Sequence, residues 1–305
     1  MTGRMRLLTL GGGEGWHADQ IRCAAVHHDC DVSQGTYPSL AASIDHDGRL
    51  VTRCDAGPLA DFDSILMRTM PMGTLETITF RLAVLHSLNK SDAVTAMVNP
   101  PRPLEIAIDK FATLAVVSSL GYPVPATHVV QSRREALDAF DALGQDCVVK
   151  PIFGGEGRGV MRIRDRELAW TAFGALESIG AVAYVQAFVA PGGRDTRLLV
   201  IGDEVFGFRR TSDSDFRTNV AGGGQCQAIA LKHEQVELAI NVCRQIGLKF
   251  ASVDLLDRDD ESPCVVEVNG IPGWKGAQQV SEVNIADRIV GLLCREASAM
   301  SQAAM

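Results

Sequence analysis

Residues 147–163, CVVKPIFGGEGRGVMRI, place a lysine at the end of an apolar strand and a glycine loop directly after it. A second apolar strand follows, so we expect a hairpin closed by a loop that contains Gly154, Gly155, Gly157 and Gly159. Glycines let the backbone approach phosphates and point its N–H groups at them, and Lys150 adds a positive charge. The loop does not match the P-loop pattern, and no helix follows it. The pattern favours a flap that closes over phosphates, with a mobile surface hairpin as the alternative.

Three oxygen-bearing side chains lie on two later apolar strands. Asp254 lies in ASVDLLD (251–257), whereas Glu267 and Asn269 lie in CVVEVNG (264–270). Side chains two residues apart share one face of a strand, so Glu267 and Asn269 point the same way. Two carboxylates and an amide oxygen suit Mg²⁺ that bridges nucleotide phosphates. The alternative is burial against Arg or Lys partners.

The segment 194–225 is rich in arginine. Within 24 residues it carries Arg194, Arg197, Arg209, Arg210 and Arg217. The planar guanidinium suits phosphate and carboxylate oxygens, and the interleaved apolar residues predict a hairpin with one buried face. Asn219 and the glycines at 222–224 follow, which is typical of a substrate loop; a solvated charged hairpin is the alternative.

The remaining pattern predicts an α/β protein of several units. Strands at 6–10, 63–68 and 93–99 and a helix at 75–88 predict a mostly parallel sheet, which we expect to end at the prolines of 100–103. Asp109 is the expected N-cap of a helix at 110–120. Further strands are expected at 124–130, 147–150, 159–164, 183–189, 195–202, 203–210, 251–257 and 264–270. Further helices are expected at 133–143, 167–178, 232–246 and 284–296.

Composition excludes several classes of protein. A net charge of −8 argues against a nucleic-acid partner, because phosphate-backbone binding needs clustered Lys and Arg. No stretch reaches the roughly 20 apolar residues of a membrane span, and the start is unlike a signal peptide. The eight cysteines lack metal-site spacing, so we expect free thiols and a cytoplasmic location.

These motifs, in this order, resemble the RimK-type ATP-grasp ligases, a group that includes α-L-glutamate ligases. The resemblance runs from about Asn99 to Ala286. It is carried by NPPRPLEIAIDKFAT, GYPVPAT, VVKPIFGGEGRGV, VQAFV, GGRDTRLLVIGDEV, FRTNVAGGG, GLKFASVDLL, VVEVNGIPGWKG and NIA. It implies an ATP-grasp fold, α/β and α+β, with an amino-terminal Rossmann-like domain (1–98), a central subdomain with the flap (99–185) and a carboxy-terminal subdomain (186–305).

The resemblance also implies roles for individual residues. The ATP ligands would be Lys110, Lys150, Gly154, Gly155, Gly157, Gly159, the hinge residues Gln186, Ala187, Phe188 and Val189, and the ribose-side acid Asp195. Catalysis would fall to Arg210 and Arg217, substrate contacts to Asn219, Gly223 and Gly224, and Mg²⁺ or Mn²⁺ binding to Asp254, Glu267 and Asn269. Ala187 departs from the acidic residue usual in the hinge.

The resemblance implies an ATP-dependent ligase. A small-molecule carboxylate, activated as an acyl phosphate, would be joined to an amine. Glutamate is the expected amino acid, and a peptide end, a small amine such as tyramine, or a pterin or furan precursor is the expected partner. The resemblance also points to a homo-oligomer. The alternatives are a catalytically inactive ATP-binding regulator and a dehydrogenase.

A few other features are weaker candidates for a site. In GGGEG (11–15), Trp16 stands where a dinucleotide fingerprint needs its last glycine, so a tight turn is the better interpretation. The pair His27 and His28 has no partner at metal-site spacing, and we expect it to end a helix. Arg68 and Lys275 are lesser candidates for substrate contact.

Overall fold

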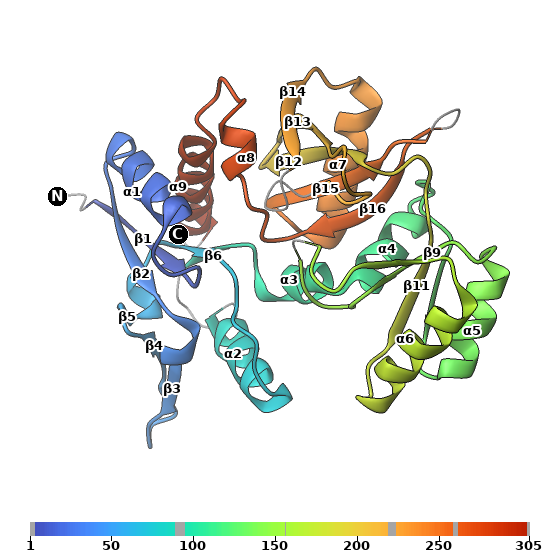
Figure 1. Ribbon diagram of the computed structural model, residues 1–305. Helices are drawn as coiled ribbons and strands as arrows, with labels where there is room; N and C mark the ends of the chain where they lie inside the picture. Colours follow the sequence, from blue (N-terminus) through green and yellow to red (C-terminus); the bar gives the residue numbers. More distant parts are fainter. Residues whose placement is uncertain (1–3, 89–94, 156, 219–223, 259–261, 304–305) are drawn as a thin grey trace.

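The amino-terminal part of the computed structural model is built on a parallel sheet of strand order β2-β1-β6-β7 (Figure 1). The model describes residues 4–88, 95–155, 157–218, 224–258 and 262–303. The strands of this sheet are β1 (Met5–Leu10), β2 (Cys30–Gly35), β6 (Ser64–Met67) and β7 (Ala96–Val98), and its helices are α1 (Trp16–His27) and α2 (Leu75–Leu88). A small antiparallel sheet contains β3 (Ala41–Ile44), β4 (Leu50–Cys54) and β5 (Gly57–Pro58).

The middle part is an antiparallel sheet of order β10-β9-β11-β8, with two helices packed on it (Figure 1). Its elements are β8 (Thr127–Val130), α5 (Arg133–Ala142), β9 (Cys147–Lys150), β10 (Met161–Ile163), α6 (Arg166–Ser178) and β11 (Ala183–Ala187). Ser132 and Asp165 begin the two helices, because their side chains accept the N–H groups of Glu135 and Leu168. Phe140, Phe173 and Val185 belong to a separate apolar core between helices and sheet.

The third part is an antiparallel sheet of order β14-β13-β12-β15-β16. Its elements are β12 (Arg194–Ile201), β13 (Glu204–Thr211), β14 (Gln225–Ile229), α7 (His233–Ile246), β15 (Phe250–Leu256) and β16 (Cys264–Asn269). Two earlier helices, α3 (Pro101–Ile108) and α4 (Lys110–Ser119), contact β16. Val117 of α4 therefore shares a core with Val253 and Val268 of the two neighbouring strands.

The end of the chain returns to its beginning. After the short α8 (Lys275–Gln278), α9 (Ile285–Ala303) packs against α1, β6 and β7 (Figure 1). One core therefore includes Leu7 of β1, Leu199 of β12, Phe250 of β15 and Ile289 of α9. Burial of that shared apolar surface holds the first and third sheets together.

Asn99 makes a polar connection at the same junction. Its Nδ2 donates to the carbonyls of Phe250 and Gly270 at 2.6 and 2.8 Å. Its Oδ1 accepts the amides of Lys249 and Phe250 at 2.7 and 3.0 Å. The side chain is buried, so one amide group joins the end of β7 to both β15 and the end of β16.

Most elements expected from the sequence are confirmed, including the parallel first sheet, the hairpin about Gly202 and the Asp109 cap of α4. The helix predicted from residue 284 continues to Ala303. Strand β7 ends at Val98, before the prolines of 100–103, as predicted. The helix α3, which begins at Pro101 where a helix needs no N–H donor, was not predicted. Strands β2 to β5 and β14 were not predicted.

Two further expectations concern the whole chain. All eight cysteines are free thiols, as predicted, and Cys23 is exposed. Within the described ranges, no helix has the length and apolar character needed to cross a membrane.

Candidate active site

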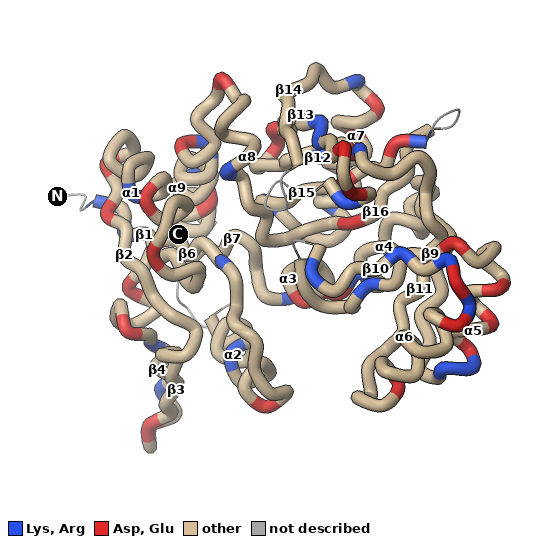
Figure 2. The backbone as a smooth tube through the Cα atoms, viewed as in Figure 1, with Lys and Arg blue, Asp and Glu red and all other residues tan. Residues whose placement is uncertain are grey.

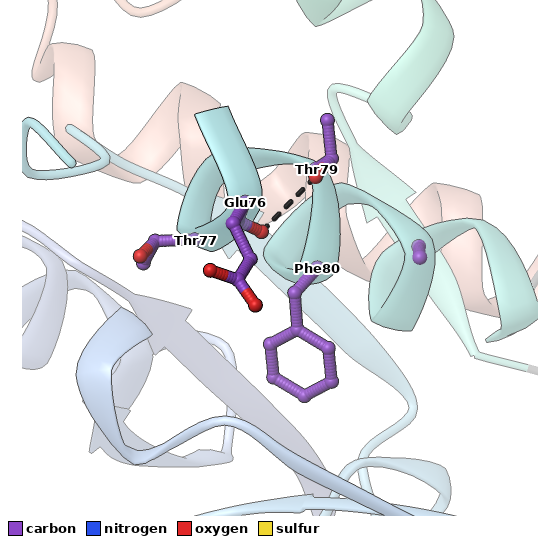
Figure 3. A pocket seen from close by; sticks show the side chains of 5 residues that line it. Glu76, Thr77, Thr79 and Phe80 are labelled. Carbon is purple, nitrogen blue, oxygen red and sulfur yellow. Dashed lines mark hydrogen bonds between the residues drawn. The ribbon is translucent and has the colours of Figure 1, made fainter. Parts of the chain in front are cut away.

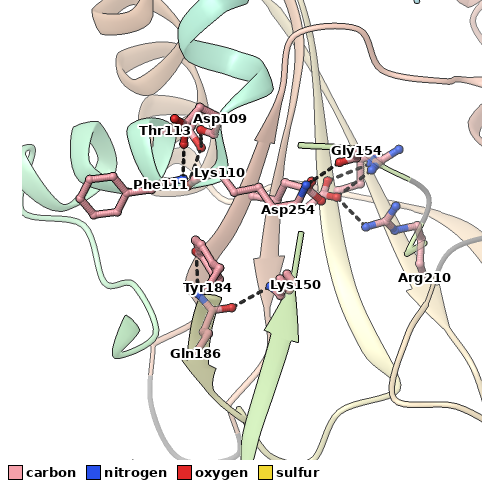
Figure 4. Close-up of polar contacts among 12 residues, drawn as sticks. Asp109, Lys110, Phe111, Thr113, Lys150, Gly154, Tyr184, Gln186, Arg210 and Asp254 are labelled. Atoms are coloured by element: carbon pink, nitrogen blue, oxygen red, sulfur yellow. Dashed lines mark hydrogen bonds and ion pairs between the residues drawn. The ribbon is translucent and has the colours of Figure 1, made fainter. Parts of the chain in front are cut away.

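Lys110, the first residue of α4, connects three segments that are far apart in the sequence (Figure 4). Its Nζ donates to the carbonyl of Gly154 in the glycine loop and lies 3.5 Å from Oε1 of Glu267 on β16. Asp109 fixes the start of α4, because its carboxylate accepts the N–H groups of Phe111 and Ala112. The predicted phosphate lysine, the flap and one predicted metal ligand therefore lie together.

Lys150, the last residue of β9, lies near Lys110 and Glu267. Its Nζ donates to Oε1 of Gln186 at 2.7 Å, and Nε2 of that buried Gln186 donates in turn to Thr127 and Tyr184 (Figure 4). Burial lowers the pKa of Lys150 to about 8; the Glu267 carboxylate opposes this shift, and Lys110 adds to it. A cation whose charge is disfavoured by burial is suited to an incoming anion, because the anion restores the lost stabilisation.

The glycine loop connects β9 and β10, which pair as an antiparallel hairpin, as predicted. Gly154, Gly157 and Gly159 have φ of 113°, 71° and 71°, conformations that other residues adopt only with strain. A Cβ on Gly159 would also lie 2.8 Å from Pro151, whereas a Cβ on Gly155 would meet open space. Three of the four predicted glycines are thus required by the backbone itself.

The hinge strand predicted to hold adenine is partly occupied by the protein. The amides of Ala187 and Phe188 donate to the carbonyls of Ala126 and Asp146 at 2.8 and 3.0 Å. Among hydrogen bonds within the described ranges, none uses the amide of Val189, which leaves that group for a nucleotide. The guanidinium of Arg162 lies 3.3 Å from the centroid of the Phe188 ring, a contact that the sequence did not reveal.

Two arginines and two aspartates form a network across β12, β13 and β15. Arg210 makes a bidentate pair with Asp195 at 2.6 and 2.8 Å, and it also donates to Asp254 at 2.8 Å (Figure 4). Arg197 forms a second bidentate pair with Asp254 at 2.8 and 2.7 Å. The hydroxyl of Thr218 donates to Oδ2 of Asp195, which also accepts from Arg210. The charges balance, as burial requires.

The pKa values within this network diverge. Burial raises the pKa of Asp195 despite its pairing with Arg210. Burial also acts to raise the pKa of Asp254, but Arg197 and Arg210 outweigh it and hold that pKa well below its usual range. The pKa of Arg210 is raised by the two aspartates. Asp254 is therefore the carboxylate that stays ionised through the acid range.

The three predicted metal ligands share one face of the sheet. Asp254 and Glu267 are directly opposite in the pairing of β15 and β16, and Asn269 lies two residues beyond Glu267. Asp254 is buried and bonded to arginines, whereas Glu267 and Asn269 are partly exposed. No trio of His, Cys, Asp or Glu suited to a metal is found in the described part of the chain. Mg²⁺ beside phosphates takes only one or two carboxylates, so this donor set fits it.

The predicted substrate loop is described in part. Arg217 pairs with Asp215 at 2.6 Å, and its Nη1 lies 3.4 Å from the carbonyl of Val160, next to the glycine loop. Gly224 precedes β14 and is partly buried, whereas Asn219 and Gly223 lie outside the described residues. Acidic and basic positions lie close together around β12, β15 and β16 (Figure 2).

A hollow on the amino-terminal part was not predicted. It lies along α2 and is lined by Glu76, Thr77, Thr79, Phe80 and Ala83 (Figure 3). Thr79 donates to the carbonyl of Glu76 within the helix, so its hydroxyl is already used. None of the predicted site residues belongs to this hollow.

Comparison with known proteins identifies the family. Residues 107–293 match the model of the RimK-like ATP-grasp domain. A tetrahydromethanopterin:α-L-glutamate ligase of Methanosarcina acetivorans is 30% identical over 264 residues, which cover 77% of this chain and 81% of that protein. A probable α-L-glutamate ligase of Sodalis glossinidius is 33% identical, with coverage of 83% and 81%. A ribosomal protein bS6–L-glutamate ligase of Escherichia fergusonii is 30% identical, with coverage of 85% and 82%.

Solved structures agree on the fold. The ATP-grasp ligase PsnB in complex with a minimal precursor superposes with a TM-score of 0.76 at 20% identity, over 95% of this chain and 98% of that one. The D-cycloserine synthetase DcsG superposes with a TM-score of 0.70, also at 20% identity, over 97% and 99%. Together with the matched domain, this shows that the chain is an ATP-dependent carboxylate–amine ligase of the RimK-like ATP-grasp family.

Proposed function

We propose that this ligase forms an amide with L-glutamate, and that ATP binds between the glycine loop and the sheet of β12 to β16. One observation carries the placement: Lys110 reaches both the glycine loop, at Gly154, and the acid Glu267. With Lys150 beside them, two cations and a flap face a carboxylate, which suits a nucleotide triphosphate. The names of the related α-L-glutamate ligases support glutamate as the amino acid.

The reaction follows from this arrangement. A carboxylate oxygen of one substrate attacks the γ-phosphorus of ATP, and ADP leaves with the electrons of the broken bond. The amine nitrogen of the other substrate attacks the activated carbonyl, phosphate departs, and the nitrogen loses a proton. No protein nucleophile takes part. The flap excludes water, which would otherwise hydrolyse the acyl phosphate.

Two arginines stabilise the charge on the transferred phosphoryl group. The Nε and Nη2 atoms of Arg210 are bonded to Asp195 and Asp254, so the guanidinium is held rigidly. In the described part of the chain, no hydrogen bond uses its Nη1, which is left for a phosphoryl oxygen. Arg217 lies beside the glycine loop, where its Nη1 is 3.4 Å from the carbonyl of Val160. Fixed donors of this kind need no reorganisation during the reaction.

Glu267, Asn269 and Asp254 would hold Mg²⁺, which would offset the negative charge of the ATP phosphates. The carboxylate of Glu267 faces Lys110, and the amide oxygen of Asn269 shares its side of the strand. Arg197 and Arg210 donate to the carboxylate of Asp254 and hold it in one orientation. Mn²⁺ would satisfy the same oxygen donors.

The test is a ligase assay in which ADP release and product mass are both measured, with L-glutamate and a panel of carboxylates and amines. The panel includes peptide ends, tyramine and pterin-type acids. We expect one combination to yield the amide, ADP and phosphate in equal amounts. Tight ATP binding with no ADP release from any combination would instead favour an inactive regulator.

A further inference from the structure

Arg68, just after β6, is a buried cation. Only 7% of it is exposed. Its Nη1 donates to the carbonyl of Pro272 at 3.2 Å, and its guanidinium lies 4.9 Å from the ring centroid of Trp274. Within the described ranges, it pairs with no carboxylate. Burial lowers the pKa of Arg68 to about 10, so the protein does not compensate this charge.

The surroundings of Arg68 are positive as well. His17 accepts the amide of Trp274 at 3.3 Å, and burial, with Arg68 and Lys275, lowers the pKa of His17 to about 4. Lys275 therefore lies close to the same group; it is exposed, and the described residues give it no acidic partner. Trp274 Nε1 is buried without a hydrogen-bond partner. A buried donor and two uncompensated cations together indicate a missing anion.

The amino-terminal turn adds further donors. Trp16 and His17 are the first residues of α1, and Gly15 before them provides no side-chain cap, so the first N–H groups of this helix are free of one. Trp16 and His17 both contact Trp274, which places this helix start beside the cations. Gly12 has φ of 81°, and a Cβ there would lie 3.1 Å from Cβ of Arg68. The glycine turn thus lets Arg68 lie against the loop.

This group of residues lies close to the candidate active site along the chain. Pro272, which holds Arg68, follows Asn269 by three residues, and three residues span at most about 10 Å. A group bound at Arg68 is therefore within reach of a substrate whose reacting atoms lie at the face of Glu267 and Asn269. Lys275 is exposed to solvent at this point.

We propose that Arg68, Lys275 and the start of α1 form a subsite for a carboxylate of the substrate that does not react. The inference rests on the proposed ligase function and adds to it a requirement for a second negative group. That carboxylate belongs either to the amino acid that supplies the amine or to a dicarboxylic acid that is activated. Arg68 binds its oxygens through the fork of the guanidinium, and Lys275 adds a point charge.

The direct test is a binding titration of the full chain without ATP. L-glutamate, glutarate and the neutral glutaramide are titrated, and the combined fluorescence of Trp16 and Trp274, which both lie beside the subsite, is recorded in a Trp170→Phe background. We expect the two anions to bind more tightly than glutaramide. We expect Lys275→Gln, at an exposed position, and Arg68→Gln each to weaken anion binding by about 10- to 100-fold. Arg133→Gln removes a cation that lies over the ring at position 170, remote from the subsite, and should leave binding unchanged.

Several outcomes would overturn the subsite. One is anion binding no stronger than glutaramide binding in the unmodified chain. Another is unchanged anion affinity in Lys275→Gln, which tests the subsite even if Arg68→Gln does not fold. Because this titration needs no turnover, it separates failure of the subsite from failure of the proposed function. In the ligase assay of Lys275→Gln, a KM increase for glutamate alone assigns the subsite to the substrate that supplies the amine. A KM increase for the other acid alone assigns the subsite to the substrate that is activated.

Discussion

At the scale of single residues, Glu267 decides whether the metal site has been identified correctly. Glu267→Gln keeps the shape of the side chain but removes the charge that faces Lys110. We expect Mg²⁺-dependent ADP formation to fall by about 10- to 100-fold or more. Glu105→Gln, at a half-buried acid that pairs with Arg102 and His86, is the control. Near-normal turnover of Glu267→Gln would refute the assignment.

Lys150 gives the nucleotide site a dependence on pH. Its folded-state pKa of about 8 lies below the ordinary lysine value, so the cation is lost as pH rises through about 8. We expect ATP affinity to fall by about tenfold per pH unit above that point. Lys150→Arg keeps its charge at these pH values and should show a flat profile, as measured by titration calorimetry. Parallel profiles for the two proteins would contradict the role of Lys150.

The residue scale also shows which site residues a local pattern can propose. Lys110, Lys150, Glu267 and Asn269 could be proposed from the sequence because each lies on a short element that is recognisable locally and carries one chemical group. Arg197, by contrast, was one of several arginines on a hairpin, and only the pairing of β12 with β15 places it opposite Asp254. Long-range register determines such partners, and a local pattern does not contain it.

At the scale of elements, the hairpin of β12 and β13 depends on its buried charges. Arg210→Met leaves Asp195 and half of the Asp254 pairing uncompensated, so we expect a loss of about 3–5 kcal/mol in the free energy of unfolding. Arg217→Met removes an exposed pair and should cost about 1 kcal/mol or less. Denaturant unfolding of both variants measures the difference. Equal losses would show that the network contributes no more than a surface pair.

Two positions of the glycine loop, Gly159 and Gly155, provide a test variant and its matched control. Gly159→Ala places a Cβ against Pro151 in a left-handed conformation, so we expect a loss of about 1–2 kcal/mol and weaker ATP binding. Gly155→Ala adds a Cβ in open space with no conformational strain and should unfold like the unmodified protein. Chemical denaturation distinguishes the two variants. Equal stability would mean that the loop tolerates either change.

The helices and strands themselves were predictable wherever the periodic pattern was long. The helix α3 was not predicted, because proline interrupts a helix from within but is favourable at the first helical position, which Pro101 occupies. The short strands β3 and β5 have too few residues for a reliable alternation. The turn before Trp16 was correctly interpreted as a turn, although its closeness to Arg68 depends on tertiary contacts.

At the scale of the whole molecule, α9 makes the first and third sheets interdependent. Ile289→Ala empties part of a core that both sheets share, so we expect a loss of about 2–5 kcal/mol. Hydrogen exchange should then increase together in β1, α1, β12 and α9. The middle sheet has a separate core and should keep its protection. Equal acceleration in residues 127–187 would show that the middle sheet depends on the same core.

The buried amide of Asn99 has a consequence for how such ligases can be recombined. Anyone who exchanges the amino-terminal part between relatives to transfer acceptor preference would naturally cut at the prolines that follow. That cut separates Asn99 from the strand ends at Phe250 and Gly270 that receive its hydrogen bonds. Because all four partners are backbone groups, either parent can supply them, but the incoming amino-terminal part must carry an asparagine at position 99. A chimera without it would leave buried backbone groups at 249–250 and 270 without a hydrogen bond.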